Sequence, residues 1–192
     1  MPSVAGQMRS EIRGVLFHES TIMSRLDEMA AEISADYGGK EITVVTVLNG
    51  SLMFSADLLR RLEMPLRLDC LSVSSYHGAS TTGVVTFNQL HLPDVHGRHV
   101  LLLDDILDSG HTLHAIRDKL LEETNPLSVK VCVLLRKDVP RQRELEADYI
   151  GFDIANEFVV GYGLDYMERF RNLPYIGVIS EEAIVKYAPK LA

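Results

Sequence analysis

Short apolar runs rich in β-branched residues recur along the chain, and each stops abruptly at polar or turn-forming residues. Ile42–Leu48 (ITVVTVL) ends at Asn49-Gly50, and Val129–Leu135 ends at a charged loop. Strands that are covered on both faces have such continuous apolar runs, and helix-like segments lie between several of the runs here. This alternation predicts an α/β protein with a mostly parallel, twisted sheet flanked by helices.

The segment after Ile42–Leu48 has the spacing of an amphipathic helix that ends before Pro65. The side chains expected to face the sheet are Leu52, Ala56, Leu59 and Leu62. With 192 residues, 46% of them hydrophobic and 24% charged, the chain can bury a substantial core. We therefore expect a single domain over residues 1–192.

Charge and cysteine content narrow the range of partners and compartments. The net charge of -8 disfavours binding to nucleic acid or to an anionic membrane, so an anionic ligand needs local positive groups or a metal. No run of about 20 apolar residues is present, and the N-terminus lacks a signal-peptide pattern, which predicts a cytoplasmic protein. Cys70 and Cys132 lie in apolar, strand-like stretches and are expected to be buried free thiols.

The most informative segment is Val100–Leu113 (VLLLDDILDSGHTL), an apolar strand that leads through acidic residues into a helix. Ligands of α/β sheets bind beyond the carboxyl ends of strands, where the next helix offers free N–H groups to an anion. Gly110 allows close backbone approach, and the hydroxyls of Ser109 and Thr112 add donors. Adjacent carboxylates at a strand end can accept from sugar hydroxyls or hold Mg²⁺.

A simpler interpretation is that the acidic residues only cap the following helix. Capping explains one of them. It does not explain three carboxylates, a glycine and two hydroxyls gathered at the end of one buried strand. We therefore interpret the segment as a ligand site.

Three collinear segments between about Val44 and Ser180 resemble the type I phosphoribosyltransferases. LLLDDILDSGHTL is similar to their signature for phosphoribosyl diphosphate. The segment from Phe158 to Ile176 resembles the purine-binding region of the hypoxanthine and hypoxanthine-guanine members, and Ser74 to Gly83 resembles their mobile loop. The resemblance implies the type I fold with a small hood formed by the terminal segments. It also implies Mg²⁺-dependent purine salvage, in which phosphoribosyl diphosphate and hypoxanthine or guanine give IMP or GMP and diphosphate.

The resemblance carries roles onto individual residues. Asp108 corresponds to the general base, and contacts with the phosphoribosyl group are implied for Asp104, Asp105, Asp108, Ser109, Gly110, His111 and Thr112. Purine contacts are implied for Lys137, Phe158, Val159 and Asp165. Diphosphate contacts are implied for Leu48, Asn49, Gly50 and Arg171. The mobile loop includes Ser75 and Tyr76, and the expected metal ligands are Asp104, Asp105 and Asp165.

These roles agree with the chemistry of the side chains. A carboxylate at Asp108 can accept a proton in the transition state. A cation at Lys137 would select 6-oxopurines, because the amino group of adenine would leave it unpaired. Without the resemblance, Lys137 could equally be a solvated residue after a strand, Phe158 a core aromatic residue, and Arg171 a partner of Glu168.

The sequence departs from the family pattern at two positions. Asn49 stands where members usually carry Lys or Arg beside the diphosphate, in a loop that often has a cis non-proline peptide, and His111 stands where others show Lys or Asn. Two alternatives stay open: a xanthine- or guanine-preferring relative, and a regulator that senses phosphoribosyl diphosphate on the same fold. Members of the family are usually homodimers or homotetramers. His91, His96 and His99 fit no metal-binding spacing and are assigned to a polar turn.

Overall fold

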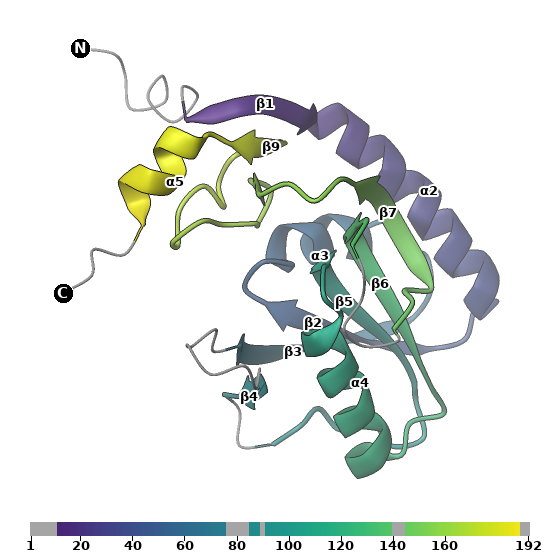
Figure 1. The fold of residues 1–192 in the computed structure, drawn as a ribbon. Helices are drawn as coiled ribbons and strands as arrows, with labels where there is room; N and C mark the ends of the chain where they lie inside the picture. The colour runs from purple at the N-terminus through teal and green to yellow at the C-terminus, as the bar shows by residue number, and fades with distance from the viewer. Residues whose placement is uncertain (1–10, 76–84, 89–90, 140–144, 189–192) are drawn as a thin grey trace. The chain divides into compact units, whose positions relative to one another are not determined.

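The computed structural model describes residues 11–75, 85–88, 91–139 and 145–188 (Figure 1). The chain forms two compact units. The larger consists of Leu26–Asn156, and the smaller consists of Met1–Arg25 together with Glu157–Ala192. Helix α2 (Glu19–Tyr37) contributes residues to both.

The larger unit contains a six-stranded sheet with the order β4-β3-β2-β5-β6-β7. The strands are β2 (Ile42–Leu48), β3 (Leu66–Ser75), β4 (Val85–Phe87), β5 (His99–Leu107), β6 (Ser128–Lys137) and β7 (Tyr149–Ile154). All neighbouring pairs are parallel except β3 and β4, which form an antiparallel pair. The predicted α/β class is therefore confirmed, and the β-branched run Ile42–Leu48 forms β2 over the predicted residues.

One face of this sheet packs against α4 (His111–Thr124). The helix buries side chains at positions 113, 116 and 120, which is the spacing of a single apolar stripe. Alternate residues of β2, β5 and β6 meet it, namely Val45, Val47, Val100, Leu102, Val131 and Val133. Because the intervening residues are also largely buried, the central parts of these strands are nearly continuous apolar runs, with Thr43 and Thr46 as buried polar exceptions in β2.

The other face carries α3 (Leu52–Leu59), and here the predicted stripe is wrong. The helix buries Phe54, Ser55 and Leu58, whereas Leu52 is 50% exposed. The face that meets the sheet carries the fully buried Phe54 and Leu58, and on the same face the hydroxyl of Thr46 on β2 donates to the hydroxyl of Ser55 at 3.0 Å. Both hydroxyls are buried, so the turn of the helix that satisfies them is the turn that faces the sheet.

The smaller unit is built from the terminal segments, as the resemblance implies. Its sheet has the antiparallel order β1-β9-β8, formed by β1 (Ile12–Phe17), β8 (Val159–Val160) and β9 (Ile176–Ile179). Helix α5 (Glu181–Tyr187) begins at Ser180, whose hydroxyl accepts from the backbone N–H of Ala183. A second apolar core lies here, made by Val160, Phe170, Leu173, Ile179 and Ala183.

None of the helices within the described ranges is long and apolar enough to cross a membrane.

Candidate functional site

The junction between β5 and α4 is a tight turn that leaves the start of the helix open. Asp108 and Ser109 follow β5, and Gly110 is the N-cap of α4, with a left-handed φ of 78°. A glycine cannot cap with a side chain, and the Ser109 oxygen lies 3.5 Å from the His111 nitrogen, at the limit of a hydrogen bond. No acidic residue occupies the first turn of α4. The capping interpretation therefore fails, and the N–H groups of this turn suit an anion.

Asp104 and Asp105 place two carboxylates next to each other near the end of β5, where their negative charges repel. Asp104 is buried, at 8% exposure, and one of its carboxylate oxygens accepts from the backbone N–H of Asp105 at 3.0 Å. Burial, and then the neighbouring Asp105 carboxylate, hold the pKa of Asp104 well above its ordinary range. A buried carboxylate in this position is stable in its charged form only when a cation or several donors compensate it.

Asp108 is paired with Lys137 across the ends of two neighbouring strands. The Lys137 ammonium lies 2.8 Å from the Asp108 carboxylate. The Lys137 side chain is only 12% exposed, whereas that of Asp108 is 50% exposed. A lysine side chain with so small an exposed fraction does not match the solvated-residue interpretation. It is a desolvated cation that needs an oxygen partner.

The loop after β2 lies against the carboxylate of Asp105. A Cβ atom added to Gly50 would lie 1.7 Å from Oδ2 of Asp105, so only glycine leaves room for that carboxylate. The preceding peptide bond, between Leu48 and Asn49, is cis. Strands β2, β5 and β6 are parallel neighbours, so the loop, the three aspartates and Lys137 all gather at the carboxyl ends of the sheet.

In the smaller unit, Phe158 is an exposed aromatic residue directly before β8. It is 48% exposed, which excludes the core-aromatic interpretation, and its ring makes an edge-to-face contact with Tyr166 at a centroid distance of 5.2 Å. Its carbonyl accepts from the N–H of Ile179, and Val159 next to it pairs with Val178 in β9. The edge of β8 is therefore fixed while the Phe158 ring stays accessible.

Asp165 and Arg171 form a second ion pair. A guanidinium nitrogen of Arg171 lies 2.8 Å from Oδ1 of Asp165, and another donates to the carbonyl of Gly163 at 2.8 Å. Glu168 is farther from Arg171, at 3.6 Å, and its own N–H donates to Asp165. The guanidinium of Arg171 suits the oxygens of a metal-bound anion, and the carboxylate of Asp165 suits the metal itself.

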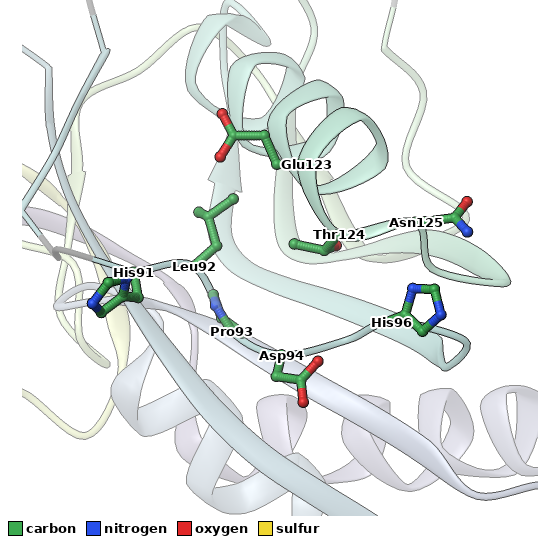
Figure 2. Close-up of a pocket in the computed structure, with 8 residues that line it drawn as sticks. All are labelled: His91, Leu92, Pro93, Asp94, His96, Glu123, Thr124 and Asn125. Atoms are coloured by element: carbon green, nitrogen blue, oxygen red, sulfur yellow. The ribbon is translucent and has the colours of Figure 1, made fainter.

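A separate pocket of about 410 Å³ lies between the last turn of α4 and the loop before β5 (Figure 2). His91, Asp94 and His96 line it from the loop, and Glu123 lines it from the helix. Figure 2 shows these side chains pointing in different directions. Over the described ranges, no three His, Cys, Asp or Glu side chains group to hold a metal. None of the predicted site residues lines this pocket.

The structure divides the predicted residues between the two units. The larger unit brings together those of the β2 loop, the β5–α4 junction and Lys137, and the smaller unit holds Phe158, Val159, Asp165 and Arg171. Ser75 ends β3, and Tyr76 lies outside the described residues. Sequence reasoning did not identify Tyr166 as a partner of Phe158, although Tyr166 lies within the segment that resembles the purine-binding region.

The family model, the similar sequences and the similar structures found by comparison with known proteins all name phosphoribosyltransferases. A family model described as the phosphoribosyl transferase domain matches residues 16–167. The hypoxanthine-guanine phosphoribosyltransferase of Streptococcus pneumoniae is 44% identical over 176 residues, covering 91% of this chain and 97% of the relative. The structure is similar to that of a Staphylococcus aureus hypoxanthine phosphoribosyltransferase, with a TM-score of 0.87, 39% identity, and coverage of 94% of this chain and 98% of the other. A Trypanosoma cruzi hypoxanthine phosphoribosyl transferase, described with a role of its C-terminal region in oligomeric state and activity, gives a TM-score of 0.85, 35% identity, and coverage of 91% and 95%.

Proposed function

The chain belongs to the phosphoribosyltransferase family, and from this premise we propose that it transfers the 5-phosphoribosyl group of phosphoribosyl diphosphate to hypoxanthine and guanine. The products are IMP or GMP and diphosphate, which makes the protein an enzyme of purine salvage. One observation carries the proposal. Asp108, which lies just before the open start of α4, is paired with the nearly buried Lys137. Relatives that match over nine tenths of the chain are named for the same reaction.

The phosphoribosyl group is assigned to the β5–α4 junction. The 5-phosphate would accept hydrogen bonds from the N–H groups of the first turn of α4 and from the hydroxyls of Ser109 and Thr112. The left-handed Gly110 keeps Cβ atoms away from this approach. Asp104 and Asp105, just before the turn, would accept from the ribose hydroxyls.

The carboxylates expected to hold Mg²⁺ belong to both units and do not form a single group of three over the described ranges. Divalent cations of this kind prefer oxygen ligands, and the raised pKa of Asp104 reflects a site where uncompensated negative charge is costly. We assign Asp104, Asp105 and Asp165 as the residues that would hold it, directly or through water. When bound, the ion would offset the charge of the diphosphate.

Asp108 and Lys137 are assigned to the purine. The carboxylate of Asp108 accepts the proton that the purine loses, while N9 forms a bond to C1 of the ribose and the bond from C1 to the diphosphate oxygen breaks. Lys137 then directs its ammonium to the oxygen at purine position 6, in exchange for its present contact with Asp108. A 6-amino group cannot accept that ammonium, so adenine would be rejected. Phe158 supplies an accessible ring for stacking, and the backbone of Val159 lies beside it.

The diphosphate is assigned to the loop Leu48–Gly50 and to Arg171. Asp165 would face the metal of a metal-bound diphosphate and Arg171 would face its oxygens, so each residue would exchange its present ion-pair partner for another group of opposite charge. Asn49 contributes no charge to this group, and its loop can contribute backbone N–H groups.

We further propose a homodimer or homotetramer. Leu52 and Met53 on α3 and Leu68 on β3 are large apolar side chains with 50%, 40% and 56% exposure. Large exposed apolar side chains contribute to subunit interfaces when they lie in one contiguous surface, which is what the proposal assigns to these three residues. Light scattering of the protein and of Leu68→Glu tests this assignment, because the variant should lower the measured mass.

The experiment that tests the function is a steady-state assay with hypoxanthine, guanine, xanthine and adenine. Asp108→Asn should lower turnover with hypoxanthine by about 100-fold or more while leaving binding of phosphoribosyl diphosphate largely intact in calorimetry. Asp94→Asn makes the same chemical change in the pocket of Figure 2 and serves as the matched control. Near-normal turnover of Asp108→Asn would remove this residue from the mechanism. Absence of transfer to any of the four purines would overturn the proposed function.

A further inference from the structure

The orientation of the exposed Phe158 ring depends on one neighbouring side chain. Nearly half of Phe158 is exposed, and its ring makes the edge-to-face contact with Tyr166, with an angle of 83° between the two planes. An exposed aromatic ring without a neighbour rotates freely, and each rotation moves the face on which a planar base would stack. The Tyr166 ring restricts that rotation and leaves enough of Phe158 exposed to receive a base.

Tyr166 is itself held at both ends. Its hydroxyl donates to the carbonyl of Ile184 in α5 at 3.0 Å. Its backbone N–H donates to Arg169, and the N–H of Arg169 donates back, which closes a tight turn. The ring also packs against the apolar core of the smaller unit. A side chain fixed by its hydroxyl, backbone and ring can transmit this rigidity to Phe158.

We infer that Tyr166 is a positioning residue for the purine, and that its ring acts by orienting the ring of Phe158. The inference rests on the proposed function, because it concerns the ring assigned to stacking. Tyr166 contacts neither the ribose nor the diphosphate in this assignment. Its loss should therefore weaken purine binding selectively.

The test compares Tyr166→Leu with Tyr166→Phe. The leucine variant loses the aromatic contact, and the KM for hypoxanthine should rise about 3- to 10-fold. Its kcat and its KM for phosphoribosyl diphosphate should stay within about twofold. The phenylalanine variant retains the ring and should restore the KM for hypoxanthine to within about twofold of that of the natural protein.

A second aromatic pair supplies the matched control. Tyr187 makes a similar contact with Phe170 at 5.8 Å, in the same core, without contacting Phe158 in the described structure. Tyr187→Leu should lower thermal stability but leave the KM for hypoxanthine unchanged. A comparable rise in the KM of this control would show that any loosening of the core has the same effect, and would overturn the inference.

Binding of IMP gives a readout that does not depend on turnover. Calorimetry should show weaker IMP binding by Tyr166→Leu, and no further weakening when this change is added to Phe158→Leu. An additive loss in the double variant, or an equal rise in the KM for phosphoribosyl diphosphate, would show that Tyr166 does not act through Phe158, and would overturn the inference. If the leucine variant does not fold, Tyr166→Met also removes the ring, and its flexible side chain adapts better to the space left in the core. Failure of the function itself would appear separately, as absent transfer by the unaltered protein.

Discussion

Gly50→Ala should damage the site more than it damages the fold. A Cβ at this position would lie 1.7 Å from Oδ2 and 2.7 Å from Cγ of Asp105. Non-bonded heavy atoms normally approach to about 3.5 Å, so the carboxylate has to move by roughly 2 Å. The backbone itself does not oppose the change, because Gly50 is not among the residues with a left-handed φ.

The expected loss of stability is small because two effects oppose each other. Forcing a side chain out of a packed position costs about 1–3 kcal/mol, and replacing glycine by alanine recovers about 0.4–1 kcal/mol by restricting the unfolded chain. The net destabilisation should be about 1 kcal/mol. Affinity for phosphoribosyl diphosphate should fall further, by roughly 10-fold or more, because hydrogen bonds to charged groups contribute about 1.5–3 kcal/mol.

The assay is urea unfolding of four proteins: the natural chain, Gly50→Ala, Asp105→Ala and the double variant. Asp105→Ala removes the obstructing carboxylate, so Gly50→Ala should no longer destabilise in that background. Calorimetry with phosphoribosyl diphosphate measures the loss of affinity in the single variant. Equal destabilisation in both backgrounds would refute the contact with Asp105 as the reason for glycine here.

Three further changes have expected outcomes. Met167 lies in a tight turn with a left-handed φ of 51°, a conformation that Asn tolerates better than Met. Met167→Asn should therefore raise the free energy of unfolding by about 0.5–1 kcal/mol, and a lower melting temperature would contradict this. Asn49→Lys should lower the KM for phosphoribosyl diphosphate about 5-fold at fixed Mg²⁺, and unchanged constants would show that this side chain does not face the diphosphate. Hydrogen bonds from Lys130 and Tyr149 lower the pKa of Asp36 from 3.8, so its contribution to stability is present above that value and lost as pH falls through the folded pKa. Unfolding measured from pH 6 to pH 2 should therefore show a smaller acid loss for Asp36→Asn than for the natural chain, and equal losses would count against it.

Much of the fold and the location of the site follow from local sequence patterns. The run Ile42–Leu48 forms a strand over the residues predicted, because β-branched side chains and the turn at Asn49-Gly50 act locally. The acidic segment that begins in the last part of β5 and runs to Asp108 could be recognised because its residue types and order are specific to one kind of ligand. The pairing of β1 with β9 could not be predicted, because strands about 160 residues apart in the chain carry no mutual signal.

Tertiary structure decided which side chains meet. The apolar spacing of α3 allowed two faces, and the structure buries the one with Phe54 and Leu58, where the hydroxyls of Thr46 and Ser55 also pair. Likewise, the sequence pattern placed Lys137 after a predicted strand, but only tertiary packing buried its side chain and set it beside Asp108. Local propensity acts over a few residues, whereas burial and polar pairing depend on segments that meet only after folding. The sequence by itself therefore determined the class of the fold and where the site lies along the chain, and the tertiary structure determined the contacts that tune it.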